Sequence, residues 1–122
     1  MSGPFDNLRD IGPRRIWDEA VVRTVEGERL TLGIVDLEPN AHVPEHRHDN
    51  EQLGMVLRGS LRFRIGDEQR DLGPGGTWSI ASEVPHEVWV GPEGAAVIDV
   101  FAPGRADWSA LSQDEPRQPF WP

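Results

Sequence analysis

The residues of this chain that are best suited to hold a metal ion are three histidines and one glutamine. His46 and His48 lie two positions apart, and Gln52 follows His48 by four positions. If this segment is a strand, its side chains alternate between two faces, so these three point the same way. Two imidazoles and an amide oxygen on one face make up most of a site for a transition metal.

A third histidine, His86, supports that interpretation. It begins an alternating run in which Val88 and Val90 share its face. The intervening residues 59–85 contain hairpin and Gly/Pro turn signals, which can return a chain to the same place in a barrel. The fourth histidine, His42, has the same parity as His46, and we interpret it as a rim or solvent-facing residue.

Asp99 is a second candidate for chemistry, because it interrupts the apolar run from Val97 to Phe101. A carboxylate inside an apolar strand is costly unless it is paired, and burial raises its pKa. Two interpretations therefore stay open. Asp99 bonds to a backbone group or an arginine, or it is a general base that faces a cavity with Phe101 beside it.

The composition limits which other groups can react. There are no cysteines and no tyrosines, and all 12 basic residues are arginine. Disulfides, thiolate chemistry, lysine Schiff bases and phenolic acids are therefore excluded. The net charge of −9 argues against nucleic acid and anionic membranes as partners. Without an 18-residue apolar run or a signal-peptide pattern, we expect no membrane span and a cytoplasmic location.

The elements that must position these residues are predicted to be short antiparallel strands. Turn signals recur every 8–12 residues, and no helical stripe of useful length lies between residues 14 and 101. We expect a sandwich or barrel of six to ten strands. The predicted strands cover residues 16–25, 30–37, 46–57, 61–65, 77–80, 84–90 and 95–101, with turns at Arg58–Ser60 and Gly91–Gly94.

We expect one structural domain with three parts. Residues 1–28 form an N-terminal arm and the first strand or strands, open to exchange within a dimer, residues 29–103 form the barrel, and residues 104–122 form a tail. The tail is predicted to contain a helical turn and to pack its apolar end on the barrel or on a neighbouring subunit.

Other side chains are interpreted as hydrophobic filler or a dimer face (Trp78 and Trp89) and as a solvated surface (Arg58, Arg62, Arg64 and Arg70).

These motifs resemble those of the cupins. The first cupin motif, G-x5-H-x-H-x3,4-E-x6-G, is matched by His46, His48, Gln52 and Gly59, with Gln in place of the acidic residue and Asn40 in place of the leading Gly. The second motif is matched at Gly75 and His86. The resemblance covers about residues 30–105. It implies an all-β, single-domain double-stranded β-helix (jelly-roll barrel) in which His46, His48, Gln52 and His86 bind one metal ion.

The implied ligand set limits the choice of metal. Three neutral imidazoles and an amide oxygen suit Mn, Fe, Co, Ni, Cu or Zn, and they are too rich in nitrogen for Mg or Ca. A glutamine in place of glutamate leaves one more positive charge on the site, which favours an anionic substrate.

The last strand adds a narrower resemblance. The pattern Asp99-x-Phe101-x-Pro103-x-Arg105-x-Asp-aromatic, together with the histidine motif, resembles the pectin-degradation (KdgF) type of small cupin. Those proteins convert ring-shaped 4,5-unsaturated monouronates to linear keto sugar acids. The resemblance implies that Asp99 moves a proton, Arg105 binds the substrate carboxylate and Phe101 lines the sugar site.

Three functions remain open at this point. The first is a metal-dependent isomerase acting on a small anionic substrate, with the unsaturated uronate as the concrete candidate. The second is a metal-dependent dioxygenase, which three histidines with open positions also permit. The third is a non-enzymatic, metal-stabilised small-molecule binding protein. A homodimer is expected in each case.

Overall fold

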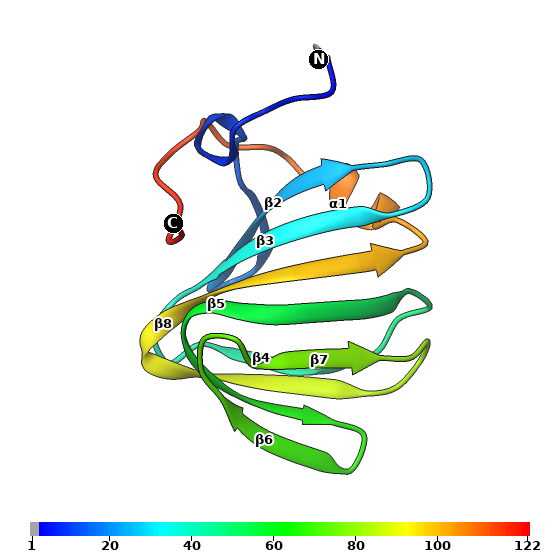
Figure 1. Cartoon of the computed structure of the whole chain (residues 1–122), viewed down its shortest axis with the longest axis vertical. Helices are drawn as coiled ribbons and strands as arrows, with labels where there is room; N and C mark the ends of the chain where they lie inside the picture. The colour runs from blue at the N-terminus through cyan, green and yellow to red at the C-terminus, as the bar shows by residue number, and fades with distance from the viewer. Residues whose placement is uncertain (1–2) are drawn as a thin grey trace.

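In the computed structural model, which describes residues 3–122, the chain forms eight antiparallel strands and almost no helix (Figure 1). The elements in chain order are the 3-10 turn η1 (Leu8–Asp10), β1 (Arg14–Trp17), β2 (Ala20–Glu26), β3 (Thr31–Leu37), β4 (His42–His46), β5 (Glu51–Ile65), β6 (Glu68–Leu72), β7 (Thr77–Ile80), β8 (His86–Ala102) and the helical turn α1 (Ala106–Ser109). Among these residues, no helix is long and apolar enough to cross a membrane. The predicted all-β barrel is confirmed.

Two long, bent strands, β5 and β8, hold the barrel together. They pair along most of their length, from Glu51 opposite Ala102 to Ile65 opposite His86. The first half of β5 also pairs with β7 and its second half pairs with β6. The two halves of β8 likewise pair with β4 and β3, and β3 continues outward to β2 and β1. Figure 1 shows how these strands curve around one interior.

The predicted turns at Arg58–Ser60 and Gly91–Gly94 are wrong, because both segments are bends inside continuous strands. The β5–β8 register shifts twice near Gly59, as at β-bulges, which bend a strand without ending it. Gly59 has a φ of +80°, and a Cβ there would lie 2.0 Å from the carbonyl oxygen of Gly94. The glycines seen in the sequence therefore permit a close crossing of the two bent strands.

The interior is filled by the inward-facing side chains of all the major strands. The predicted strand over residues 16–25 is interrupted by a turn at Asp18 and Glu19, so β1 and β2 form a short hairpin. Fully or nearly fully buried members of the core are Val22, Val35, Leu37, Val56, Leu61, Phe63, Trp78, Ile80, Ala95, Val97 and Phe101. Burying this apolar surface is the main favourable contribution to folding.

The N-terminal segment and the C-terminal tail lie together on the outside of the barrel (Figure 1). The backbone N–H of Asp114 donates to the carbonyl of Pro13 at 2.8 Å. Further along, the tail covers a buried ion pair between Arg23 and Asp36, at 2.8 Å. Arg23 also donates to the carbonyl of Arg117, and the N–H of Phe120 points to the Asp36 carboxylate. The tail therefore packs on its own barrel.

Candidate active site

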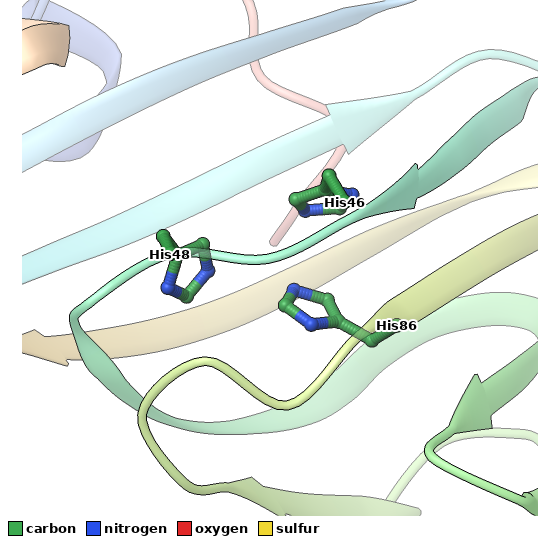
Figure 2. Close-up of side chains that lie close together, drawn as sticks. All are labelled: His46, His48 and His86. Carbon is green, nitrogen blue, oxygen red and sulfur yellow. The ribbon is translucent and has the colours of Figure 1, made fainter.

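The three candidate metal-ligating histidines converge inside one end of the barrel (Figure 2). His46 ends β4 and lies opposite His86, the first residue of β8. His48 lies in the connection between β4 and β5, so the prediction that it sits on the same strand as His46 is wrong. The chain turns at residues 47–50 and still returns His48 toward the others, and one nitrogen of each ring lies within 4.8 Å of the others.

Backbone carbonyls orient all three imidazoles. The Nδ1 atoms of His46, His48 and His86 lie 2.9, 3.0 and 2.9 Å from the carbonyl oxygens of Pro44, Asn50 and Val84. A carbonyl can only accept a hydrogen bond, so each Nδ1 carries the proton. This tautomer leaves Nε2 of each ring for another partner, as a metal-ligating histidine needs.

His86 provides the test of whether these residues suit a metal. Its Nε2 is buried and has no hydrogen-bond partner among residues 3–122. Burial lowers the pKa of His86 to about 4 and also lowers the pKa of His46, so both rings are neutral near pH 7. A buried acceptor without a donor is costly, and a cation at the centre of the three rings would satisfy it. The donor set therefore fits a divalent transition metal.

Gln52 joins the histidine cluster to Asp99. Its Oε1 lies 3.1 Å from Nε2 of His48, and its Nε2 donates to Oδ1 of Asp99 at 2.9 Å. Because Nε2 of His48 carries no proton in this tautomer, both atoms of the first contact are acceptors. Two acceptors this close indicate a position for a cation next to both, in agreement with Gln52 as a fourth ligand.

Asp99 lies deep in the barrel, near the C-terminal end of β8, and is 6% exposed. Its Oδ1 accepts two hydrogen bonds, from Nε2 of Gln52 and from the indole Nε1 of Trp78 at 2.8 Å. Its Oδ2 has no hydrogen-bond partner within residues 3–122. Burial raises the pKa of Asp99 to about 6, although the two hydrogen bonds and the charge of Arg105 oppose that rise. A carboxyl group with such a pKa can both take and release a proton near neutrality.

Arg105 is held over the same cavity by aromatic rings and an aspartate. Its guanidinium carbon lies 4.0 Å from the ring centroid of Trp108 and 4.8 Å from that of Phe101. Its Nε and Nη2 donate to the two carboxylate oxygens of Asp107, at 3.0 and 2.9 Å. Stacking and a bidentate pair fix this side chain, and its Nη1 edge remains available for a second anion.

A cavity of about 80 Å³ brings these groups together. Its walls are mainly apolar, and its lining includes His46, Gln52, His86, Asp99, Phe101 and Arg105. One buried water needs about 10–15 Å³, so there is room for several water-sized groups. An apolar cavity with a few converging polar groups of shifted pKa is the usual form of an enzyme site.

Two of the cavity residues were missed or misread in the sequence. Trp78, interpreted as filler or part of a dimer face, is buried and donates to Asp99. Trp17, which was not singled out, lies at the cavity with its ring centroid 5.9 Å from that of His46. The alternation of Trp78 with Ile80 signals an inward position, but no sequence signal reveals its neighbour.

The remaining polar candidates lie outside the cavity. His42 stacks on Trp89 and contacts Glu87 at 2.5 Å on the outer face, as expected for a solvent-facing histidine. Arg62 pairs with Asp71 there. Arg64 bridges Glu45 and Glu87 at 2.7 and 2.9 Å on the same face.

Comparisons with known proteins agree with this architecture. The chain is 36% identical over 64 residues to the pectin degradation protein KdgF of Dickeya dadantii (strain 3937), a match that covers 52% of this chain. The chain thus spans about 58% of the length of that relative. The structure of KdgF from Halomonas sp. superposes with a TM-score of 0.79, at 23% identity, over 87% of this chain and 98% of that one.

A second solved structure extends the likeness to a larger protein. Bacillus subtilis oxalate decarboxylase, described with Mn(II) centres, superposes with a TM-score of 0.72 at 25% identity. That match covers 92% of this chain and 33% of the other. The Cupin_2 (cupin domain) family matches residues 33–101, which is more than half of the chain. Together with the bent-strand barrel and its inward histidines, this match shows that the chain belongs to the cupin family.

Proposed function

We propose that this chain is a metal-dependent cupin isomerase that converts ring-shaped 4,5-unsaturated monouronates to the linear keto acid. The observation that carries the proposal is that one cavity is lined by two of the three clustered histidines, His46 and His86, by the carboxyl group of Asp99 and by the fixed guanidinium of Arg105. The likeness to a pectin degradation protein supports this substrate class.

The residues that would hold the metal are His46, His48, His86 and Gln52. Their neutral nitrogens and amide oxygen contribute no negative charge, so a divalent ion there would keep its full positive charge. Such an ion would supply electrostatic stabilisation for oxygen atoms that gain negative charge during the reaction. The cupin relative with Mn(II) centres supports a metal at such a site.

The chain's own residues have separate tasks in this proposal. The Nη1 edge of Arg105 binds the substrate carboxylate, since its other edge is already paired with Asp107. Oδ2 of Asp99 takes the proton of the C1 hydroxyl as the bond between C1 and the ring oxygen breaks, which leaves an aldehyde at C1 and an enolate at C5. The proton that Asp99 has taken is then returned at C4 as the enolate becomes the C5 ketone. The product has the same atoms as the substrate, so no oxidant or co-substrate is needed.

The test uses purified protein whose metal content has been measured. Incubation with the unsaturated monouronate should remove the 4,5-unsaturated chromophore faster than in buffer alone, with or without oxygen. Asp99→Asn should keep the metal and lose this acceleration. A fully metal-loaded protein that leaves the chromophore at the buffer rate would refute the proposal, and strict dependence on oxygen would favour a dioxygenase instead.

We also propose that two copies of the chain associate through the outer face of β2, β3, β8 and β5. One row across this face consists of Val25, Leu32, Val100 and Leu53, and the next contains Ile98 and Met55. Val25 and Leu53 are 52% and 50% exposed. Large exposed apolar patches of this kind mark interaction sites.

The charges that flank this face favour a second copy as its occupant. Along the outward side of β5, the apolar residues Leu53 and Met55 lie between Glu51 and Arg58, which are both exposed. If two copies pack with their β5 strands antiparallel about a two-fold axis, each Glu51 lies near Arg58 of the other copy. The face is therefore complementary to itself in both polarity and charge.

A further inference from the structure

The carboxylate of Asp99 is held asymmetrically by the barrel. Oδ1 receives two N–H donors, Nε2 of Gln52 at 2.9 Å and Nε1 of Trp78 at 2.8 Å. Oδ2 has no donor among the residues that the structure describes. Two donors from different strands fix the rotation of the carboxylate plane, because a single donor would leave it free to turn.

Glycine makes the contact between Trp78 and Asp99 geometrically possible. Asp99 on β8 lies opposite Gly54 on β5, and Gly54 lies opposite Trp78 on β7. The indole therefore crosses over Gly54 to reach the carboxylate. A Cβ at position 54 would lie 2.2 Å from Nε1 of Trp78 and 2.3 Å from Oδ1 of Asp99. Any L side chain at this position would separate the two partners.

Packing alone does not account for this placement of Trp78. The side chain is buried, with 7% exposure, and its ring packs on Phe63 at a centroid distance of 4.9 Å. A phenylalanine could make that apolar contact equally well. The indole is distinguished by its single N–H, and that N–H is directed to one oxygen of the buried carboxyl group.

From these contacts we propose that Trp78 is a positioning residue for Asp99. Its N–H reaches across Gly54 and fixes Oδ1 in place. Oδ2 is then the oxygen that remains for the substrate proton. This inference rests on the proposed isomerase function, in which Asp99 moves the proton. It adds two residues, Trp78 and Gly54, to those that the cupin motifs identify.

The main test is Trp78→Phe, which keeps the ring packing and removes the N–H. Loss of one hydrogen bond to a charged group should reduce kcat about 10- to 100-fold. KM and metal content should stay close to those of the wild type, since neither the histidines nor Arg105 touches the lost atom. The matched control is Trp89→Phe on the outer face, which should keep wild-type kcat.

A second variant breaks the same contact from the other side. Gly54→Ala should lower kcat to a similar extent, and the double variant Gly54→Ala/Trp78→Phe should be no slower than Gly54→Ala alone. If both changes act on one hydrogen bond, their reductions in kcat are not cumulative. The reductions caused by two unrelated packing defects would instead multiply. Melting temperature and metal content show whether each variant folds.

A readout without substrate separates this inference from the proposed function. The chain has five tryptophans, and the indole N–H signal of Trp78 in a nitrogen-15 spectrum is the one missing from Trp78→Phe. Asp99→Asn should shift that signal. If the signal shifts but the wild type does not process the uronate, the proposed function fails and the contact stands. Wild-type kcat in a folded Trp78→Phe, or an unmoved indole signal, would overturn the proposal.

Discussion

The side-chain amide of Gln52 donates its Nε2 hydrogen to Oδ1 of Asp99 across 2.9 Å. The other end of the same amide, Oε1, lies 3.1 Å from Nε2 of His48. One planar group therefore contacts both the candidate metal ligands and the candidate proton-transfer residue. A carboxylate at position 52 could not do this, because it has no hydrogen to donate to Asp99. The glutamine that departs from the cupin motif thus supplies an N–H donor to its neighbour Asp99.

We predict that Gln52→Glu keeps the metal and loses most of the activity. The substitution would place a second carboxylate beside Asp99, and two carboxylates in contact favour a shared proton. Asp99 would then no longer exchange a proton freely. Metal content measured by elemental analysis should equal or exceed that of the wild type, while kcat for loss of the unsaturated chromophore should fall at least about 10-fold, as for removal of a proton-transfer group. Unchanged kcat would contradict this account of Gln52.

Much of the histidine cluster could be predicted from spacing, although for a partly wrong reason. Parity on a single strand placed His46, His48 and Gln52 on one face. In the structure a turn separates β4 from β5, and the ring of His48 returns to the cluster because its Nδ1 is held by the carbonyl of Asn50. Local periodicity correctly predicted that these side chains point the same way, but it did not predict the turn between β4 and β5 that directs His48.

The surroundings of Asp99 could not be predicted from sequence. Its neighbours Gln52, Gly54 and Trp78 belong to other strands, and their contact depends on the register of β8 with β5 and of β5 with β7. Register between distant strands depends on packing across the whole barrel. For the same reason the sequence predicted ordinary turns where Gly59 and Gly94 form bends. The buried pair of Arg23 with Asp36 likewise becomes visible only once β2 and β3 are aligned.

Removal of one ring from the cluster should abolish metal binding. We predict that His86→Ala loses the metal, because the buried Nε2 of His86 is the acceptor that lacks any other partner in the described part of the chain. The matched control is His42→Ala, whose ring lies on the outer face. In the wild type and in this control, added metal should raise the melting temperature. At a free metal concentration of 100 times Kd, the gain in the free energy of unfolding is about 2.7 kcal/mol. His86→Ala with wild-type metal content would contradict the proposed ligand set.

The pairing of Asp107 with Arg105 predicts an acid-dependent contribution to stability. The hydrogen bonds from Arg105 lower the pKa of Asp107 below its usual value. The unfolded chain then binds more protons than the folded one between the two pKa values, so stability rises with pH in that window. The contribution is fully present above about pH 4, near the unfolded pKa, and is lost as the pH falls further.

Urea unfolding of the wild type and of Asp107→Asn at several pH values measures this contribution. Because Asp107 is largely exposed, the variant should be less stable by no more than about 1 kcal/mol at pH 7. The difference should shrink as the pH falls below about 4, near the unfolded pKa of Asp107. A difference that stays constant down to pH 3 would show that the ion pair is not its origin.

The outer face of β5 provides the last prediction. We expect the wild type to be a dimer in solution and Leu53→Asp to be a monomer, because the side chain of Leu53 is half exposed at the β5 end of the apolar row. An unpaired carboxylate there would have to be buried in the interface, which costs several kcal/mol. Light scattering after size-exclusion chromatography measures both masses, and Glu93→Gln, at a bend away from this face, is the control. The cavity residues named above all belong to one chain, so the monomer should retain bound metal. A wild type that remains monomeric at high concentration, or a dimeric Leu53→Asp, would show that this face is not the interface.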